Sequence, residues 1–501
     1  MEIYWIGGKF MEAATLFIRS IQNYVWGPVA WGILLGAGVI FTIRLKGYQV
    51  TRFTYFMNHT IIDMFRKPEN KLNPIEGKGD ISPWQSLMTS FSATMGVGTL
   101  AGTATAIAWG GPGAVFWMWV VGFFGIATKF NEVILACHFR GANAKGEVLS
   151  GPFAYMEKGI PIKWLGKCFA VVFALFGALG AFGIGNMVQA NSAAGAVVHV
   201  FPGANRLIVG IVAAVLIGAV IIGGIKSIAR TVDKIIPFLA ITAILTSIII
   251  LLSSITAVPY AFGLIIRGAF SGASLTGGVG GVAVMYAVRL GLQRGIFSNE
   301  AGLGSGAIAY SAARTKHPVK TSMWGSFEVF LDTHVMCTLI ALVILTQVPL
   351  ADIAPGFGTA LITAAPLVIQ SYQNSLFGVQ FGGWLMAFLM ATFGFTTVIG
   401  WAYVGEKCFE YLLGPKWGIK LRIGYRILIL PATVFGAYGG VALIWAIADV
   451  MNAFMALPNI VAVVILSGVS AKIAADYFAG KKYEPLPDSF NAEAEEVLKT
   501  E

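Results

Sequence analysis

Charged side chains are scarce in this 501-residue sequence. Asp, Glu, Lys and Arg together make up 12% of it, whereas a soluble domain carries roughly a quarter. Apolar residues reach 57%. So little charge cannot cover a water-facing surface of this size, which excludes a soluble enzyme, a disordered chain and a nucleic-acid-binding protein. The composition predicts an all-α polytopic membrane protein.

Catalytic and metal-binding motifs are also lacking. The four cysteines, Cys137, Cys168, Cys337 and Cys408, form no CxxC pair, which argues against a disulfide framework or a metal knuckle. The sequence has no G-x-x-x-x-G-K-[ST] phosphate loop, no HExxH motif and no nucleophile elbow. We therefore expect no enzyme activity, no ATP hydrolysis and no cofactor, and an ion gradient as the energy source.

Long apolar runs are abundant instead. A membrane-spanning helix needs about 20 mostly apolar residues, and eleven segments meet this requirement. The seventh of them is too long and too polar for one plain helix. The predicted spans are 24–43, 84–108, 112–136, 168–199, 207–224, 235–254, 276–310, 326–347, 379–404, 427–447 and 453–471.

Lysine and arginine are distributed unequally between the loops that join these spans. Alternate loops and the C-terminal tail hold 27 of them, against four on the other side. Because basic loops stay in the cytoplasm, we expect an outside N-terminus and a cytoplasmic C-terminus in the cell membrane of a prokaryote, with the basic excess facing anionic lipid. Inside the spans, Lys129 with Glu132 is expected to snorkel to the cytoplasmic interface, whereas Arg289 and Arg294 either anchor the seventh span or gate access.

Two of the spans carry signals of interruption. The segment 92–103 holds three glycines and four hydroxyl side chains, and the segment 295–305 holds an Asn-Glu pair followed by Gly-Leu-Gly. Since a helix interrupted inside lipid survives only around a cavity, both segments indicate a central binding site. The alternatives are a small-residue packing face in the first segment and, in the second, a span that ends near Leu290 and leaves Glu300 in a cytoplasmic loop.

The two interruptions occupy corresponding places in two halves of five spans each. Because five is odd, the halves are predicted to be inverted relative to each other. The chain then divides into residues 1–83 with the extra first span, 84–254 and 255–471 as the two repeats, and 472–501 as a cytoplasmic tail. Paired interruptions in inverted halves are typical of the binding site of secondary transporters.

Two further spans contribute polar side chains. Asn186 and Gln189 share one helical face and either bind a zwitterion or join helices. Thr396 and Thr397 are adjacent in the ninth span. Their hydroxyls are either satisfied within the helix or serve as hard oxygen ligands of a cation.

Four stretches resemble sequences typical of the alanine or glycine:cation symporter family, namely Gly110–Trp119, Gly185–Asn191, Phe297–Ser305 and Gly400–Lys407. They occur in the family's order, from about residue 80 to residue 410. The resemblance implies the leucine-transporter fold, with two inverted five-helix repeats after one extra helix. It also implies sodium-coupled uptake of a small neutral amino acid, alanine or glycine.

The same resemblance implies two sets of site residues. A sodium ion would lie between the first interruption and the ninth span, bound by the carbonyls of Ser92 and Met95 and the hydroxyls of Thr396 and Thr397. Trp401 would cap the pocket against longer side chains. The amino acid would be surrounded by Gly96, Gly98, Thr99, Gly102, Asn186, Gln189, Asn299 and Trp401.

The chain departs from the family at residues 98–100, which read Gly-Thr-Leu where Gly-Asn-Ile is usual. An asparagine carbonyl binds a cation better than a threonine hydroxyl does. This departure weakens the case for a second sodium site made of Thr94, Thr99, Ser298 and Asp332.

Two alternatives to sodium symport stay open at the level of sequence. Proton coupling is one, since Glu300 and Asp332 can titrate. We nevertheless expect both acids either to stabilise the structure or to orient the ligand-binding residues without contacting the ligands themselves. A channel is the other, because broken helices alone do not exclude it.

Overall fold

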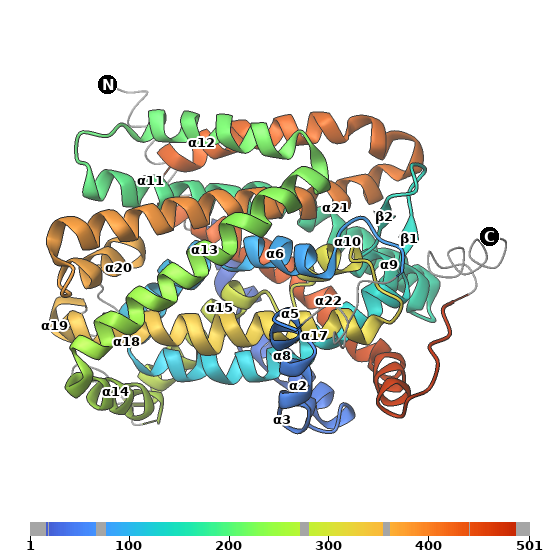
Figure 1. Cartoon of the computed structure of the whole chain (residues 1–501), viewed down its shortest axis with the longest axis horizontal. Coiled ribbons are helices and arrows are strands. Elements are labelled where there is room, and N and C mark those ends of the chain that lie inside the picture. The colour runs from blue at the N-terminus through green and yellow to red at the C-terminus, as the bar shows by residue number, and fades with distance from the viewer. Residues whose placement is uncertain are drawn as a thin grey trace.

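A computed structural model describes residues 17–66 apart from 19, 77–270, 280–353, 361–439 and 441–486. In this part of the chain the regular structure is helical apart from one short antiparallel hairpin of β1 (Gly141–Ala142) and β2 (Val148–Leu149). Many of the helices run along the long axis of the molecule (Figure 1).

Helices of very different length follow one another along the chain. In chain order they are α2 (Pro28–Arg44), α3 (Tyr48–Thr51), α4 (Phe53–Asn58), α5 (Ile61–Met64), α6 (Pro83–Thr94), α7 (Val97–Gly110), α8 (Gly113–His138), α9 (Pro152–Gly159), α10 (Lys163–Phe182), the π-helix η2 (Gly183–Met187), α11 (Val188–Val200), α12 (Arg206–Ile221), α13 (Gly224–Ser253), the 3-10 helix η3 (Ile255–Ala257), α14 (Val258–Phe270), α15 (Gly280–Asn299), α16 (Ser305–Ser311), α17 (Pro318–Val329), the π-helix η4 (Phe330–Cys337), α18 (Thr338–Gln347), α19 (Leu350–Ile353), α20 (Ala364–Gln373), α21 (Gly378–Tyr438) and α22 (Val441–Phe478).

Six helices of the described ranges are long and apolar enough to cross a membrane by length and composition. Side chains such as Val215 on α12 and Phe238 on α13 are exposed on the outer surface, as expected of a surface that faces lipid. The total of eleven spans stays a prediction. The six helices are Gly113–His138, Lys163–Val200, Gly224–Ser253, Pro318–Gln347, Gly378–Pro415 and Ile444–Phe478, and shorter apolar helices cover Pro28–Arg44, Arg206–Ile221 and Ile255–Phe270.

One predicted span, 427–447, is wrong. Helix α21 ends at Tyr438 and α22 begins at Val441, so a turn lies where continuous helix was expected. The Asn191 amide fixes this turn by donating to the carbonyls of Gly436 (3.0 Å) and Gly439 (2.8 Å). Hydropathy does not register the turn because the residues on both sides of it are apolar. The helix α14 was likewise not predicted.

The start of α6 follows from local sequence. Ser82 is its N-cap and Pro83 its first residue, and Ser82 and Gln85 form a reciprocal capping box. Gln85 also donates to Asp233 of α13 at 3.1 Å. The first interrupted helix is therefore anchored at its beginning.

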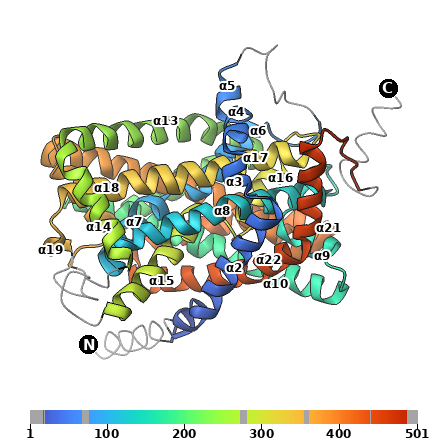
Figure 2. The same cartoon turned by 90° about the horizontal axis from the view of Figure 1, so that it is seen from below.

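An ion pair holds the hairpin at one end of the bundle. Figures 1 and 2 show α14 and α19 at one end and α9 at the other. Near α9, Arg422 pairs with Glu147 of the hairpin connection at 2.5 Å. Burial raises the pKa of Glu147, but hydrogen bonds from Arg422 and Asn143 outweigh it and lower the pKa to about 2. This carboxylate is therefore ionised at every physiological pH, and the pair holds the hairpin to α21.

A buried ion pair joins α12 to the two arms of α21, which meet where Gly414 takes a φ of 72°. Arg426 donates from Nε and Nη2 to the Glu406 carboxylate, at 2.6 and 2.7 Å. Its Nη1 donates to the Ile222 carbonyl at the end of α12, at 2.7 Å. Both charged side chains are buried, so neither charge has water to replace its partner.

We expect Glu406→Ala to destabilise the protein by about 3–5 kcal/mol, because it leaves the Arg426 guanidinium buried without a counter-charge. Thermal unfolding of the purified protein in detergent measures the effect. The control is Asp476→Ala, which removes an exposed bond with Lys472 (2.8 Å) and should leave the midpoint where it is. Equal midpoints for the two variants would contradict the assigned role of Glu406.

Candidate functional site

The first interruption is confirmed and lies between α6 and α7, at Met95 and Gly96. Gln189 of α11 accepts the amide of Val97 at 3.1 Å and so satisfies the first free N–H of α7. A Cβ on Gly96 would lie 2.2 Å from the Thr397 hydroxyl and 3.0 Å from the Gln189 carbonyl oxygen. Only glycine lets the broken backbone approach α11 and α21 this closely.

The second interruption lies between α15 and α16, so the interpretation that ends this span near Leu290 is wrong. Glu300 is buried and has a φ of 54°, and Gly302 and Gly304 also have positive φ, a region that favours glycine. Asn299 accepts the Ala301 amide at 2.9 Å. The break is thus a defined, internally bonded turn.

The two interruptions meet. The Ser298 hydroxyl oxygen of α15 lies 3.2 Å from the Thr99 hydroxyl oxygen of α7, and both hydroxyls donate to the Asp332 carboxylate. A Cβ on Gly98 would come within 2.9 Å of the Phe297 ring, whereas one on Gly102 would meet open space. The small-residue packing face therefore exists at Gly98 and is part of the contact between the two breaks.

The four residues expected to bind sodium lie on facing parts of α6 and α21. A Cβ on Gly400 would lie 2.3 Å from the Ser92 hydroxyl, and Thr397 adjoins Gly96 next to Met95. The Thr396 and Thr397 hydroxyls both donate to the Phe393 carbonyl, at 3.0 and 2.9 Å, which leaves their oxygen lone pairs available. The last carbonyls of α6 lack a following helical amide. These hard oxygen donors suit a small cation.

The residues expected around the amino acid are only partly gathered. Gly96, Gly98, Thr99 and Gln189 surround the first break, as described above. Trp401 is buried, donates to Glu300 at 2.9 Å, and packs on Gly185, where a Cβ would lie 2.2 Å from the Trp401 Cβ. It therefore joins α21 to the second break.

Two of the residues expected around the amino acid are hydrogen-bonded to other parts of the protein. The Asn186 amide donates to the Ile429 carbonyl of α21 at 2.7 Å, as the helix-joining alternative predicts. The Asn299 amide donates to Thr333 at 2.9 Å. Gly102 borders open space and contacts neither break.

The residues expected at a second cation site come together around Asp332 of η4, except for Thr94. Thr99, Ser298 and Thr333 donate their hydroxyls to the buried Asp332 carboxylate, at 2.6, 2.7 and 3.2 Å. In the described part of the chain no lysine or arginine pairs with it.

A second acidic cluster was not foreseen. Glu328 of α17 accepts hydroxyl bonds from Ser90 and Thr94 of α6 (2.9 Å each) and from Tyr310 of α16 (2.8 Å). Lys129 of α8 lies 3.8 Å from it and is fully buried, so the expectation that Lys129 snorkels is wrong. The sequence signal for this cluster is the single charge of Glu328 within an apolar run. Within the described ranges no cluster of three or more His, Cys, Asp or Glu side chains is able to hold a metal ion.

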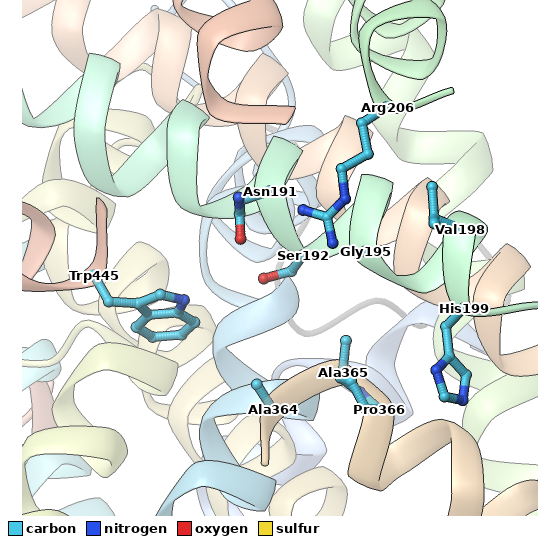
Figure 3. A pocket seen from close by; sticks show the side chains of 10 residues that line it. All are labelled: Asn191, Ser192, Gly195, Val198, His199, Arg206, Ala364, Ala365, Pro366 and Trp445. Carbon is cyan, nitrogen blue, oxygen red and sulfur yellow. The ribbon is translucent and has the colours of Figure 1, made fainter. Parts of the chain in front are cut away.

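Two cavities lie toward the end of the bundle that carries α14 and α20. The larger, about 520 Å³, is lined by residues of α7, α15, α20 and α22, including the ion pair of Arg294 and Asp449 at 2.7 Å. The smaller, about 270 Å³, is shown in Figure 3, where Arg206 lies across from Ala365 on the opposite wall. Trp445 lines both cavities.

This geometry agrees with comparisons to known proteins. A profile described as the sodium:alanine symporter family matches residues 11–491. The chain belongs to the sodium:alanine symporter family. Members of this family similar to it include the sodium/alanine symporter AgcS of Methanococcus maripaludis, 42% identical over 90% of this chain and 94% of the relative. The probable sodium/glutamine symporter GlnT of Bacillus subtilis is 37% identical over 94% and 92%.

Solved structures place this member of the symporter family among leucine-transporter-like folds. MhsT in complex with L-phenylalanine matches 80% of this chain and 99% of its own, with a TM-score of 0.52 and 12% identity. A Na+-coupled sialic acid symporter matches 82% of both chains, with a TM-score of 0.50 and 12% identity. The chain is therefore a helical, multi-pass membrane transporter.

We expect Gly96→Ala to lower the stability of this symporter-family protein by about 1–3 kcal/mol, because the new methyl group overlaps the Thr397 hydroxyl and must displace α21. Gly102→Ala, two turns along the same helix, is the matched control, since its methyl group enters open space. Thermal midpoints in detergent compare the two. A loss of stability that is larger for Gly102→Ala would contradict the assigned geometry of the break.

Proposed function

We propose that this protein couples the entry of sodium to the uptake of a small neutral amino acid, alanine or glycine, by alternating access. The observation that carries the proposal is the meeting of two interrupted helices, with the hydroxyl oxygens of Ser298 and Thr99 3.2 Å apart and both hydroxyls bonded to Asp332. Such a meeting leaves helix ends, rather than charged side chains, to bind the ligands.

The substrate is proposed to lie between the start of α7 and the end of α15. A helix N-terminus carries partial positive charge and a C-terminus partial negative charge. The amides near Gly98 then receive the amino acid's carboxylate, and the last carbonyls of α15 its ammonium group. Trp401, held by Glu300, limits the side chain to hydrogen or methyl by steric exclusion, since attraction alone separates a methylene by only about 1–3 kcal/mol.

Sodium is proposed to bind the carbonyls of Ser92 and Met95 and the hydroxyls of Thr396 and Thr397. One sodium ion that moves through about 100 mV supplies roughly 2.3 kcal/mol, and a tenfold sodium gradient adds about 1.4 kcal/mol. Together they suffice for about 500-fold accumulation of a neutral solute. One ion therefore drives useful uptake.

The arrangement in the membrane is part of the proposal. Residues 84–254 and 255–471 form the two inverted repeats, residues 1–83 precede them, and 472–501 form the tail. The excess of lysine and arginine in the segments near α9 supports a cytoplasmic location for that end of the bundle. This orientation places the cavity beside α14 and α20 on the outside of the cell membrane.

Two related proteins support alternatives in coupling and substrate. YrbD of Bacillus subtilis, which is 34% identical to this chain, is described as a putative sodium/proton-dependent alanine carrier protein. A proton-coupled mechanism is therefore the second candidate. The similar GlnT is described as a probable sodium/glutamine symporter, so glutamine belongs in any substrate screen beside alanine and glycine.

We expect Thr397→Ala to raise the sodium concentration for half-maximal alanine uptake by about tenfold or more, because losing one oxygen ligand costs at least about 1.4 kcal/mol. Labelled alanine uptake into proteoliposomes under an inward sodium gradient measures it. Thr392→Ala is the control, because this hydroxyl lies on the same helix, is only half-buried, and donates to the Phe388 carbonyl one turn earlier.

An unchanged sodium requirement in Thr397→Ala would remove the residue from the sodium site. Uptake that fails to saturate with alanine, and shows no exchange with alanine inside the vesicles, would favour a channel over a symporter.

For Asp332→Asn we expect sodium to stay the driving ion, because the proposed sodium ligands lie on α6 and α21 rather than on η4. The amide keeps the shape of the side chain while removing its charge, so bonds from Thr99 and Ser298 weaken and maximal uptake falls. Uptake under matched sodium and proton gradients checks this. A variant that loses uptake driven by protons, when the unmodified protein has it, would assign the coupling to Asp332.

A further inference from the structure

The larger cavity contains buried polar atoms without hydrogen-bond partners. Among the described residues, no protein group bonds to Nε or Nη1 of Arg294, Oδ1 of Asp449 or Nε2 of Gln293. All three side chains are at least nine-tenths buried and line the cavity. Because buried polar groups in native proteins are almost always paired, these atoms indicate a polar ligand in the cavity.

The chemistry of these atoms is complementary to a zwitterion. Arg294 and Gln293 offer donors, which suit a carboxylate, and Asp449 offers an acceptor, which suits an ammonium group. Nη2 of Arg294 is bonded to Oδ2 of Asp449 at 2.7 Å, so the pair is neutral as a whole. A neutral pair that keeps an unpaired donor on Arg294 and an unpaired acceptor on Asp449 favours a neutral ligand that carries both charges over a simple anion or cation.

Two aromatic rings connect the cavity to the first break. The Arg294 guanidinium stands over the rings of Trp445 (4.8 Å) and Phe297 (5.5 Å). These two rings are 5.2 Å apart, and Phe297 is the ring that closes on Gly98. This aromatic pair therefore connects the unpaired atoms to the proposed substrate site.

We propose that the larger cavity is an access site that binds an amino-acid zwitterion before it reaches the helix breaks, with its carboxylate at Arg294 and Gln293 and its ammonium group at Asp449. The identity of the ligand as an amino acid rests on the proposed function. Arg289 also lines the cavity and is bonded to the neutral Asn23 at 2.5 Å. Its positive charge makes binding of a simple anion the competing outcome of the test.

The test uses cysteine labelling of the full-length protein in proteoliposomes. Trp109 lines the cavity and is 41% exposed, which makes Trp109→Cys a suitable reporter. Of the four native cysteines only Cys168 is exposed, so Cys168→Ala removes the background labelling by maleimide. Thr397→Ala and sodium-free buffer disable the proposed central site. Alanine is the probe, and a maleimide measures access to position 109.

Alanine at ten times its Kd should slow labelling about tenfold, because about one site in eleven is then free. Propionate and ethylamine, which carry one charge each, should give no comparable protection. The double variant Arg294→Gln with Asp449→Asn should lose the protection without leaving an unpaired charge. Gln293→Leu, which leaves the ion pair intact, should weaken it, and gel filtration verifies that both variants fold.

Absence of protection by alanine, or equal protection by propionate or chloride, would overturn the access site. So would protection that survives in both variants. Failure of the proposed function is distinguished by a separate measurement, because it appears as absent sodium-driven alanine uptake by the unmodified protein, whether or not position 109 is protected.

Discussion

Backbone groups released at a helix break inside lipid must find partners within the protein, because hydrocarbon offers none. Side-chain amides take this role here. Gln189 accepts the amide of Val97 at the first break, Asn299 accepts that of Ala301 at the second, and Asn459 donates to a carbonyl of the second break. If these amides were misplaced, the breaks would be unsatisfied, so the packing of α11, α15 and α22 around them determines whether a central site exists.

Buried charge follows the same rule on both sides of the breaks. Toward α14, Arg294 of α15 is held by Asp449 of α22. Toward α9, Glu328 of α17 gathers hydroxyls from α6 and α16 beside Lys129 of α8. Since an unpaired charge in this setting is strongly destabilising, each cluster determines which helices stay together at its end. Both interrupted helices are thereby tied to their neighbours in the described conformation.

The interruptions were predictable because glycine, hydroxyl and Asn-Glu residues stand out inside apolar runs. The hydrogen-bond and ion-pair partners of individual side chains could not be predicted from the sequence. Asn186 and Gln189 share a face on a regular α-helix, but Asn186 lies in the π-helix η2, which shifts the register and leaves Asn186 on α21 and Gln189 on α7. Lys129 was misjudged because its partner, Glu328, is distant in sequence. The span at 427–447 failed because hydropathy carries no signal for a turn between apolar residues.

The departure at Thr99 now has a structural reason. Its hydroxyl makes the shortest of the three hydrogen bonds to the buried Asp332 carboxylate, at 2.6 Å. Such a bond stabilises the carboxylate without a metal ion. An asparagine at position 99 would carry both an NH2 donor and a carbonyl oxygen, so it could bond the carboxylate and still offer an oxygen to a cation. In this chain a cation near η4 would therefore have to be bound by Asp332 itself and displace the hydroxyl hydrogens that stabilise it. The threonine thus agrees with the proposal of a single sodium site between α6 and α21.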